Sequence, residues 1–227
     1  MKLAVINFSG NVGKSTIARH LLAPRITRCE VIAVESINAD DAQGKTVRGR
    51  QFAELQEFLQ TPANVVVDIG ASNVEELLLL MRRYRGSHLD FDGYIVPTVP
   101  ARKQQQDSAA TLAELARIGV PASRVRLVLN QVADDEPFER VFEILLAYCA
   151  ASKTVEPRLT ACLHYNEVHA RVRGTDQSLK APDRLPATNR ASRLRIPAVL
   201  RSLCGRLNSE SADHDHRSAF APPCRTV

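Results

Sequence analysis

The sequence predicts a doubly wound α/β fold, with a mostly parallel sheet and helices on both faces. Short apolar runs rich in β-branched residues, such as NVVVDI at 64–69, recur along the chain. Continuous apolar runs of this kind are typical of strands buried on both faces. They alternate with stretches of helical periodicity, which indicates a parallel sheet covered by helices on both sides.

The order of the elements follows from these runs and from the residues that interrupt them. Ser72 is expected to cap the third helix, with Glu75 and Glu76 in its first turn. Pro97 is expected to end the fourth strand. The strands are expected at 2–8, 31–34, 64–69, 93–96, 126–129 and, weakly, 158–163; the helices are expected at 15–22, 47–59, 72–85, 107–118 and 136–150.

Length and composition indicate one α/β domain with a tail. The chain has 227 residues, 44% of them hydrophobic, and carries 30 Lys and Arg against 25 Asp and Glu, with a pI of about 9.1. A mildly basic protein suits nucleic acid or an anionic membrane as a partner where the charge is clustered. Five scattered cysteines without a CxxC pair indicate reduced thiols. The apolar runs, such as 77–81, are too short to span a bilayer. We expect a cytoplasmic protein without a signal peptide.

The stretch VINFSGNVGKSTIARHLL, residues 5–22, has the composition of a phosphate-binding loop. Such a loop needs glycines that let backbone N–H groups point inward at a helix N-terminus, a lysine for the β- and γ-phosphates, and a hydroxyl for Mg²⁺. The common spacing GxxxxGK[ST] fails, because Phe8 stands where its first glycine would be. The strand–loop–helix context still predicts nucleotide binding, and a plain structural turn is the alternative. The candidate residues are Gly10, Asn11, Val12, Gly13, Lys14, Ser15 and Thr16.

Polar residues also end the other predicted strands, where ligands of such sheets bind. Asp68 ends VVVDI, at the place where nucleotide-hydrolysing folds put the carboxylate that orients Mg²⁺ through water. The alternative is an ordinary strand-end Asp that caps the next turn. Glu35, Thr98 and Asn130 end three further strands.

With these residues in view, the chain resembles the ParA/MinD family of deviant Walker A ATPases, and within it the plasmid-stability StbB group. The family loop K-G-G-x-G-K-[ST]-[ST] aligns with residues 9–16, which removes the difficulty at Phe8. The resemblance covers roughly residues 1–170 and implies ATP and Mg²⁺ as cofactors. It places Asp68 at the Walker B position and Asn130 where the family has an asparagine that recognises adenine, although Asn is also a common turn residue.

Two departures from the family pattern bear on catalysis. Ser9 replaces the signature lysine, which in the family reaches the phosphates of a partner subunit in a nucleotide-dependent dimer. Glu35 and Ile37 stand where the family has D-x-D, so Asp40 or Asp41 is left to position the attacking water; both can equally be solvated loop acids. Loss of a cation at the transition state costs about 10³–10⁵ in rate. We therefore expect slow hydrolysis, with Lys14 and Asp40 as the catalytic residues.

The C-terminal part divides into a basic segment at 171–208 and a tail at 209–227 that we expect to be disordered. Within the basic segment Ile196, Val199, Leu200, Leu203 and Leu207 fall on one helical face, with arginines around it. Three interpretations remain open: a helix packed on the domain, a surface that contacts DNA without reading sequence, or a membrane-surface helix.

Three functions are compatible with the sequence. The first is an ATP-binding switch with slow ATPase activity in plasmid stability, partition or positioning, with a link to conjugative transfer, a plasmid-encoded DNA-binding partner protein and a nucleotide-dependent homodimer. The second is a catalytically weak adaptor that docks such a partner. The third is a small-molecule enzyme similar to dethiobiotin synthase, for which Thr98 and Lys103 are the only candidate substrate residues.

Overall fold

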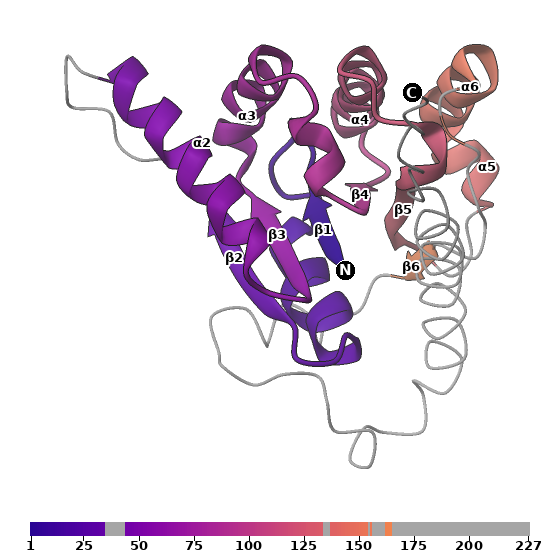
Figure 1. Ribbon diagram of the computed structural model, residues 1–227. Coiled ribbons are helices and arrows are strands. Elements are labelled where there is room, and N and C mark those ends of the chain that lie inside the picture. The colour runs from indigo at the N-terminus through magenta and orange to yellow at the C-terminus, as the bar shows by residue number, and fades with distance from the viewer. Residues whose placement is uncertain (35–43, 134–136, 154, 156–161, 165–227) are drawn as a thin grey trace, which may run out of the picture.

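The computed structural model describes residues 1–34, 44–133, 137–153, 155 and 162–164 (Figure 1). These residues form one six-stranded sheet with the order β2-β3-β1-β4-β5-β6, in which every pair of neighbours is parallel. The predicted fold class is therefore confirmed. The predicted segments 171–208 and 209–227 lie outside the described residues, as do Glu35, Ile37, Asp40 and Asp41. The strands are β1 (Lys2–Val5), β2 (Glu30–Val34), β3 (Val65–Ile69), β4 (Gly93–Thr98), β5 (Val125–Val132) and β6 (Cys162–His164).

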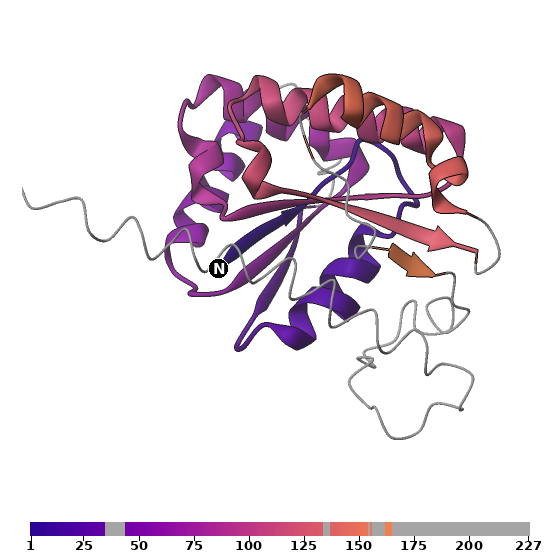
Figure 2. The same cartoon turned by 90° about the vertical axis from the view of Figure 1, so that its right-hand side faces the viewer.

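Helices cover both faces of the sheet, as Figure 2 shows from the side. The longer helices α2, α3, α4 and α6 form one layer, and the helical segment that follows β1 lies against the opposite face. The helices are α1 (Lys14–Thr16), the π-helix η1 (Ile17–Leu22), α2 (Gly44–Gln60), α3 (Ala71–Arg83), α4 (Arg102–Arg117), α5 (Phe138–Val141) and α6 (Glu143–Ser152), with short 3-10 turns η2 (Ala23–Arg25), η3 (Ser87–Asp90) and η4 (Ala122–Arg124).

The apolar core follows from the strand patterns and lies on both faces. All five residues of β3 and all six of β4 are buried. On the face covered by α2, α3, α4 and α6, alternate residues of the central strands pack against apolar residues of those helices. On the other face Leu3, Val5 and Val66 pack against Ile17 and Leu22 of η1. Removal of this apolar surface from water stabilises the sheet by roughly 25 cal/mol per Å².

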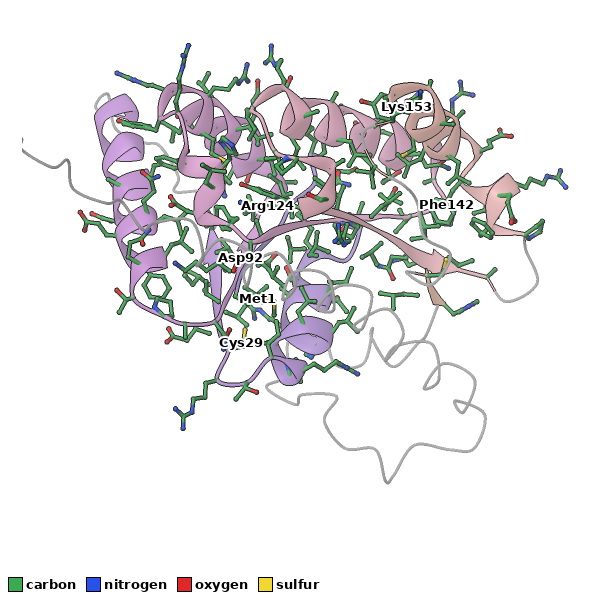
Figure 3. The ribbon with its side chains drawn as sticks, turned by 45° about the vertical axis from the view of Figure 1, so that its right-hand side comes forward. Met1, Cys29, Asp92, Arg124, Phe142 and Lys153 are labelled. Atoms are coloured by element: carbon green, nitrogen blue, oxygen red, sulfur yellow. The ribbon has the colours of Figure 1, made fainter. Side chains whose placement is uncertain are left out.

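The start of the chain is held at the amino-terminal edge of the sheet (Figure 3). The Met1 amino group donates a hydrogen bond of 2.9 Å to Asn64 Oδ1, and the Lys2 N–H donates one of 2.7 Å to Asp92 Oδ2. These contacts lie at the end of β1 away from the loop that follows it. The loop therefore leaves the opposite edge, where β1 is flanked by β3 and β4.

Several predicted helix boundaries are wrong for local reasons. Ser72 does not cap α3, which begins at Ala71 after Gly70 without any side-chain cap, so Glu75 and Glu76 fall outside its first turn. The helix α4 begins at Arg102, five residues earlier than predicted, because RKQQQD consists largely of good helix formers. The predicted helix 136–150 is divided at Phe142, whose φ of −111° and ψ of 25° interrupt it.

Three strand boundaries also differ from the prediction. The strand β1 ends at Val5, three residues early, because the chain already turns into the loop. The strand β4 continues through Pro97 to Thr98, since Pro97 lies past the last residue paired with β1 and needs no N–H on that side. The strand β5 extends to Val132 through an irregularity at Gln131, which has a φ of 59°.

Candidate functional site

The loop between β1 and α1 lies at the point where the strand order reverses. The chain moves to one side of β1 for β2 and β3 and to the other side for β4, and ligands of open parallel sheets bind in the crevice at such a point. The loop is the indigo segment that leaves β1 in Figure 1. Its backbone turns through left-handed conformations at Asn11, with a φ of 58°, and at Gly13, with a φ of 90°. Asparagine and glycine are the residues that adopt this conformation most readily.

The helix that opens at Lys14 has no side-chain cap at its N-terminus. Gly13 is the residue before it. The Ile17 N–H donates a backbone hydrogen bond of 2.9 Å to the Gly13 carbonyl. The first N–H groups of a helix have no partner within it, and together with the helix dipole they attract anions. The predicted phosphate-binding residues therefore lie on one uncapped helix start, with Gly10, Asn11 and Ser15 exposed to solvent.

The Lys14 side chain lies back against the loop. Only 8% of Lys14 is exposed, and its Nζ donates hydrogen bonds to the Ser9 carbonyl at 2.6 Å and to the Asn7 carbonyl at 3.1 Å. Burial lowers the pKa of this ammonium group, and the negative charge of Asp68 partly opposes that shift. The loop thus holds a desolvated cation beside an uncapped helix start, which is a suitable arrangement for a phosphate group.

A pH dependence follows from this lysine. Because burial lowers its pKa below the usual value, Lys14 loses its charge at a lower pH than an exposed lysine does. We expect the affinity for a nucleoside triphosphate to fall as the pH is raised above neutral, before exposed lysines with a pKa of about 10.4 titrate. Isothermal titration calorimetry at a series of pH values measures this affinity. A Lys103→Met variant, which removes an exposed lysine, should keep the same profile; a flat profile for the unaltered chain would contradict the assignment of Lys14.

Asn7 supports the loop from below, and the sequence reading missed it. The side chain is fully buried, and its Nδ2 donates to the Pro97 carbonyl and to Ser108 Oγ, both at 2.7 Å, while its Oδ1 accepts from the Ser9 N–H at 2.7 Å. Next to it, the Phe8 N–H donates to Thr111 Oγ1 at 3.1 Å. The loop is therefore tied to β4 and to α4. The available signal was a polar residue directly after the apolar run 3–6.

Replacing Asn7 with alanine should destabilise the protein strongly. The change removes three hydrogen bonds and leaves the buried Ser9 N–H and Pro97 carbonyl short of partners, which costs about 2–4 kcal/mol of unfolding free energy. Urea denaturation measures this. Gln60→Ala, which removes an exposed amide at the end of α2, should change stability by less than about 0.5 kcal/mol. Equal effects of the two substitutions would mean that the hydrogen bonds of Asn7 contribute no net stability.

Ser9 contacts an acid of α4. Hydrogen bonds from Lys103 and from the Ser9 side chain lower the pKa of Asp107, and the Lys103 Nζ lies 2.6 Å from Asp107 Oδ2. Lys103 itself is 77% exposed on its side chain. A chain of polar contacts therefore runs from the start of the loop to the first turns of α4, through residues that are far apart in the sequence.

Asp68 and Ser15 carry a carboxylate and a hydroxyl, the kinds of oxygen group that bind a magnesium ion. Asp68 is 5% exposed near the end of β3, paired in register with Val5 of β1, and close enough to Lys14 to affect its pKa. Mg²⁺ is usually bound through one or two carboxylates or hydroxyls together with substrate phosphates and waters. The donor set therefore fits the predicted ion. The described residues contain no group of three or more His, Cys, Asp and Glu that could hold a metal by itself.

Asn130 lies against the loop rather than at a distance from it. Its Nδ2 donates a hydrogen bond of 3.0 Å to the Val12 carbonyl. A Cβ atom added at Gly13 would lie 2.4 Å from the same nitrogen. In this structure the Asn130 side chain therefore fixes the loop, and the packing gives a second reason, besides backbone conformation, for a glycine at position 13.

Thr98, at the carboxyl end of β4, is the other buried polar side chain at this edge. It is fully buried, and its hydroxyl has no hydrogen-bond partner among the described residues. Of the predicted site residues, the structure brings together the loop, Asp68 and Asn130. Asp40 lies outside the described residues, so its predicted role remains a prediction.

Comparisons with known proteins agree with this arrangement at the level of the fold. No protein-family model and no curated protein matches the chain. Three similar solved structures are apo McdA from Cyanothece (11% identity, TM-score 0.55), a Borrelia burgdorferi B31 protein assigned to plasmid partition and bound to AMPPNP (12%, 0.56), and the MinD cell division protein of Aquifex aeolicus (11%, 0.56). The chain has the ParA/MinD-type fold. The matches cover 88–90% of this chain and 95–98% of those chains.

The ParA/MinD-type fold here includes no transmembrane helix among the described residues: each described helix is too short or too polar to cross a bilayer.

Proposed function

We propose that this protein is an ATP-binding switch with slow ATPase activity, of the ParA/MinD type and closest to the StbB group. It would act in plasmid stability, partition or positioning, with a link to conjugative transfer. The observation that carries the proposal is the loop itself, in which an uncapped helix start, a left-handed Gly13 and the buried ammonium of Lys14 meet. The shared fold with a partition-assigned protein that binds AMPPNP supports it.

Each residue of the site has a definite role in this proposal. The N–H groups of residues 10–16 surround the phosphates, and Lys14 turns from its carbonyl partners to the β- and γ-phosphates. Ser15 and Asp68 would hold Mg²⁺, which when bound would screen the phosphate charge. Asn130 would recognise the adenine, as the resemblance to the family implies, and Asp40 is the candidate for positioning water.

Slow turnover follows from the surroundings of Ser9. Where the family has a lysine, this chain has the uncharged hydroxyl of Ser9, which helps to lower the pKa of Asp107, and the ammonium of Lys103 is paired with that acid. Ser9 therefore cannot neutralise charge that develops on the phosphates as the family lysine would. The loss is worth up to about 10³–10⁵ in rate, which suits a timer better than a metabolic catalyst.

The proposal includes binding partners, which are inferred from the sequence and from the fold. A plasmid-encoded DNA-binding protein would be the specific partner, ATP would promote a homodimer, and the basic C-terminal region would contact DNA through phosphates without reading sequence. Contact with a membrane surface is the lesser alternative. The proposal places the protein in the cytoplasm.

Phosphate release tests the proposal. Purified full-length protein with ATP and Mg²⁺ should release phosphate slowly, above the background of a Lys14→Ala variant, and faster with DNA or the partner protein. Release equal to that background under every condition, with ATP binding retained, would favour the second candidate, a nucleotide-binding adaptor. The contact between Ser9 and Asp107 is the observation that favours the adaptor. A dethiobiotin-synthase-like enzyme is less favoured, because the Lys103 ammonium already binds Asp107.

A further inference from the structure

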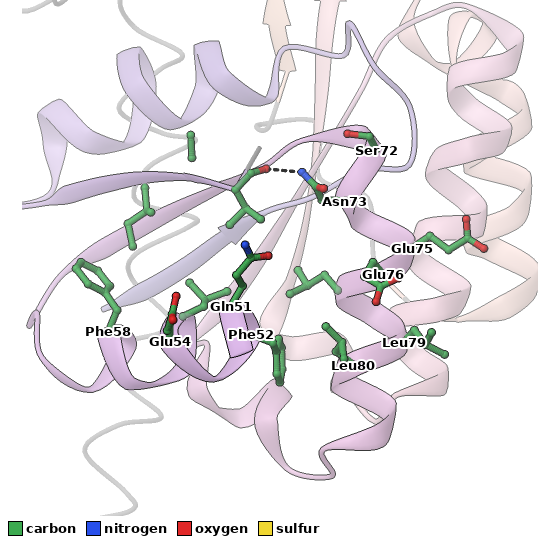
Figure 4. A pocket seen from close by; sticks show the side chains of 15 residues that line it. Gln51, Phe52, Glu54, Phe58, Ser72, Asn73, Glu75, Glu76, Leu79 and Leu80 are labelled. Atoms are coloured by element: carbon green, nitrogen blue, oxygen red, sulfur yellow. Dashed lines mark hydrogen bonds between the residues drawn. The ribbon is translucent and has the colours of Figure 1, made fainter. Parts of the chain in front are cut away.

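An open apolar groove lies between α2 and α3, over the edge strand β2 (Figure 4). Its volume is about 750 Å³, which is in the range of pockets that bind ligands or side-chain clusters. One wall is α2, the other is α3, and β2 forms the floor. Its apolar lining comes mainly from Ile32, Val34, Phe52, Leu55, Phe58 and Leu80.

The groove leaves apolar surface uncovered. Leu79 of α3 is 52% exposed. Among the described residues β2 has a neighbour on one side only, which is β3. Sheet edges and apolar patches left open in this way are usually covered by another segment.

The rim of the groove is acidic. Glu54, Glu75 and Glu76 line it, and the lining residues include no lysine or arginine. Glu54 and Glu75 are exposed, and neither has an ion pair with another described residue. In Figure 4 Glu54 lies on α2 and Glu76 on α3 beside the opening, and Glu75 lies on the far side of α3. A segment that fits this groove should have one apolar face and positive charges beside it.

The chain contains a segment with that chemistry beyond the described residues. Between residues 184 and 209 the sequence has six arginines and no aspartate or glutamate. Within it, residues 196, 199, 200, 203 and 207 are apolar at helical spacing, the pattern by which amphipathic helices bind in grooves.

We propose that residues 193–207 of the same chain bind in this groove as a helix, with their apolar face on the floor and arginines beside the three glutamates. As a helix the segment would be about 22 Å long, close to the about 20 Å of the 13-residue α3. The connection from His164 to Arg193 spans up to about 95 Å when extended. The six strands place the groove about 24 Å from β6, so the segment reaches it within one chain. The proposal does not depend on nucleotide binding.

Binding of the segment in the groove would affect the nucleotide site, because the turn after β3 contacts both. Asn73 Nδ2 and the Gly70 N–H both donate to the Val34 carbonyl, at 2.8 and 3.0 Å, and Asp68 lies two residues before Gly70. Binding of the segment in the groove would also place its arginines beside the glutamates of the rim, where they cannot contact DNA phosphates.

A disulfide trap tests the position of the segment, because Cys204 is native to it. We would use the full chain with Cys224→Ser and introduce Leu79→Cys in the groove. Mild oxidation should give an intramolecular disulfide, seen as a faster-migrating monomer on a non-reducing gel and lost with Cys204→Ser. Ala116→Cys, on the exposed side of α4, is the control for random encounter. Docking should make trapping at position 79 at least roughly tenfold faster, through a higher effective concentration.

Substitutions in the segment and on the rim sharpen the test. Leu203→Asp, on the apolar face, should reduce trapping to the control rate, whereas Ala198→Asp, on the opposite face, should not. Glu54→Lys combined with Glu75→Lys should slow trapping as well. Melting temperatures would confirm that each variant is folded. Cys204-dependent dimers in place of monomers would assign the groove to a second copy and overturn the proposal, and so would equal trapping at positions 79 and 116.

Discussion

Replacing Lys14 with alanine is expected to abolish ATP binding at micromolar nucleotide. The ammonium group is held at the start of the helix, where it would contact the β- and γ-phosphates, and a charge-assisted contact in a partly desolvated site is worth about 3 kcal/mol or roughly 100-fold in affinity. Equilibrium dialysis with labelled ATP measures the loss.

Stability should change little in this variant. Removing Lys14 relieves the cost of a buried cation but also removes two hydrogen bonds to carbonyl groups, and these effects oppose each other. Lys103→Ala, at an exposed lysine of α4, should retain ATP binding and serves as the matched control. Binding by the Lys14→Ala variant equal to that of the unaltered chain would end the assignment of this loop as a phosphate site.

Replacing Gly13 with alanine should be the most disruptive single change in the loop. The added Cβ would meet Asn130 Nδ2 at 2.4 Å, and a φ of 90° is strained for any residue with a side chain. Backbone strain of this kind costs about 1–3 kcal/mol, and moving Asn130 also breaks its bond to the Val12 carbonyl. We expect a total loss of about 3–5 kcal/mol in unfolding free energy, measured by urea denaturation.

A double variant separates the two causes. Adding Asn130→Ala to Gly13→Ala removes the steric conflict but not the strain, so stability should recover by about 1–2 kcal/mol and no further. Gly10→Ala is the matched control, because no atom lies within 4 Å of its added Cβ and its φ is not positive. It should cost less than about 0.5 kcal/mol. A Gly13→Ala variant as stable as Gly10→Ala would mean that the loop adopts a different conformation in solution.

The sequence alone predicts the parts of this fold that depend on local patterns. Runs such as VVVDI identify central strands because parallel strands are buried on both faces. The sequence likewise identifies the loop, because glycine, lysine and serine follow a strand and open a helix. Neither inference needs knowledge of which segments are neighbours in space.

The remaining parts depend on contacts between residues distant in the sequence. Asn7 is a loop support only because Ser108, 101 residues later, lies beside it. Asp107 reaches Ser9 only once α4 packs on β4, and no spacing rule indicates that pair. The boundary errors have a similar origin: Pro97 remains in its strand because of where β1 stops pairing.

The carbonyl contacts of Lys14 have a kinetic consequence. The Lys14 ammonium donates to two neutral carbonyl oxygens of the loop, which take the hydrogen-bonding positions that phosphate oxygens would take. Nucleotide binding would then require only that the flexible Lys14 side chain exchange these carbonyl groups for phosphate oxygens. Side-chain motions of this kind take picoseconds to nanoseconds. Association should therefore follow diffusional encounter with the nucleotide, without a slow rearrangement of the backbone, and any delay in the cycle would fall on the steps after binding.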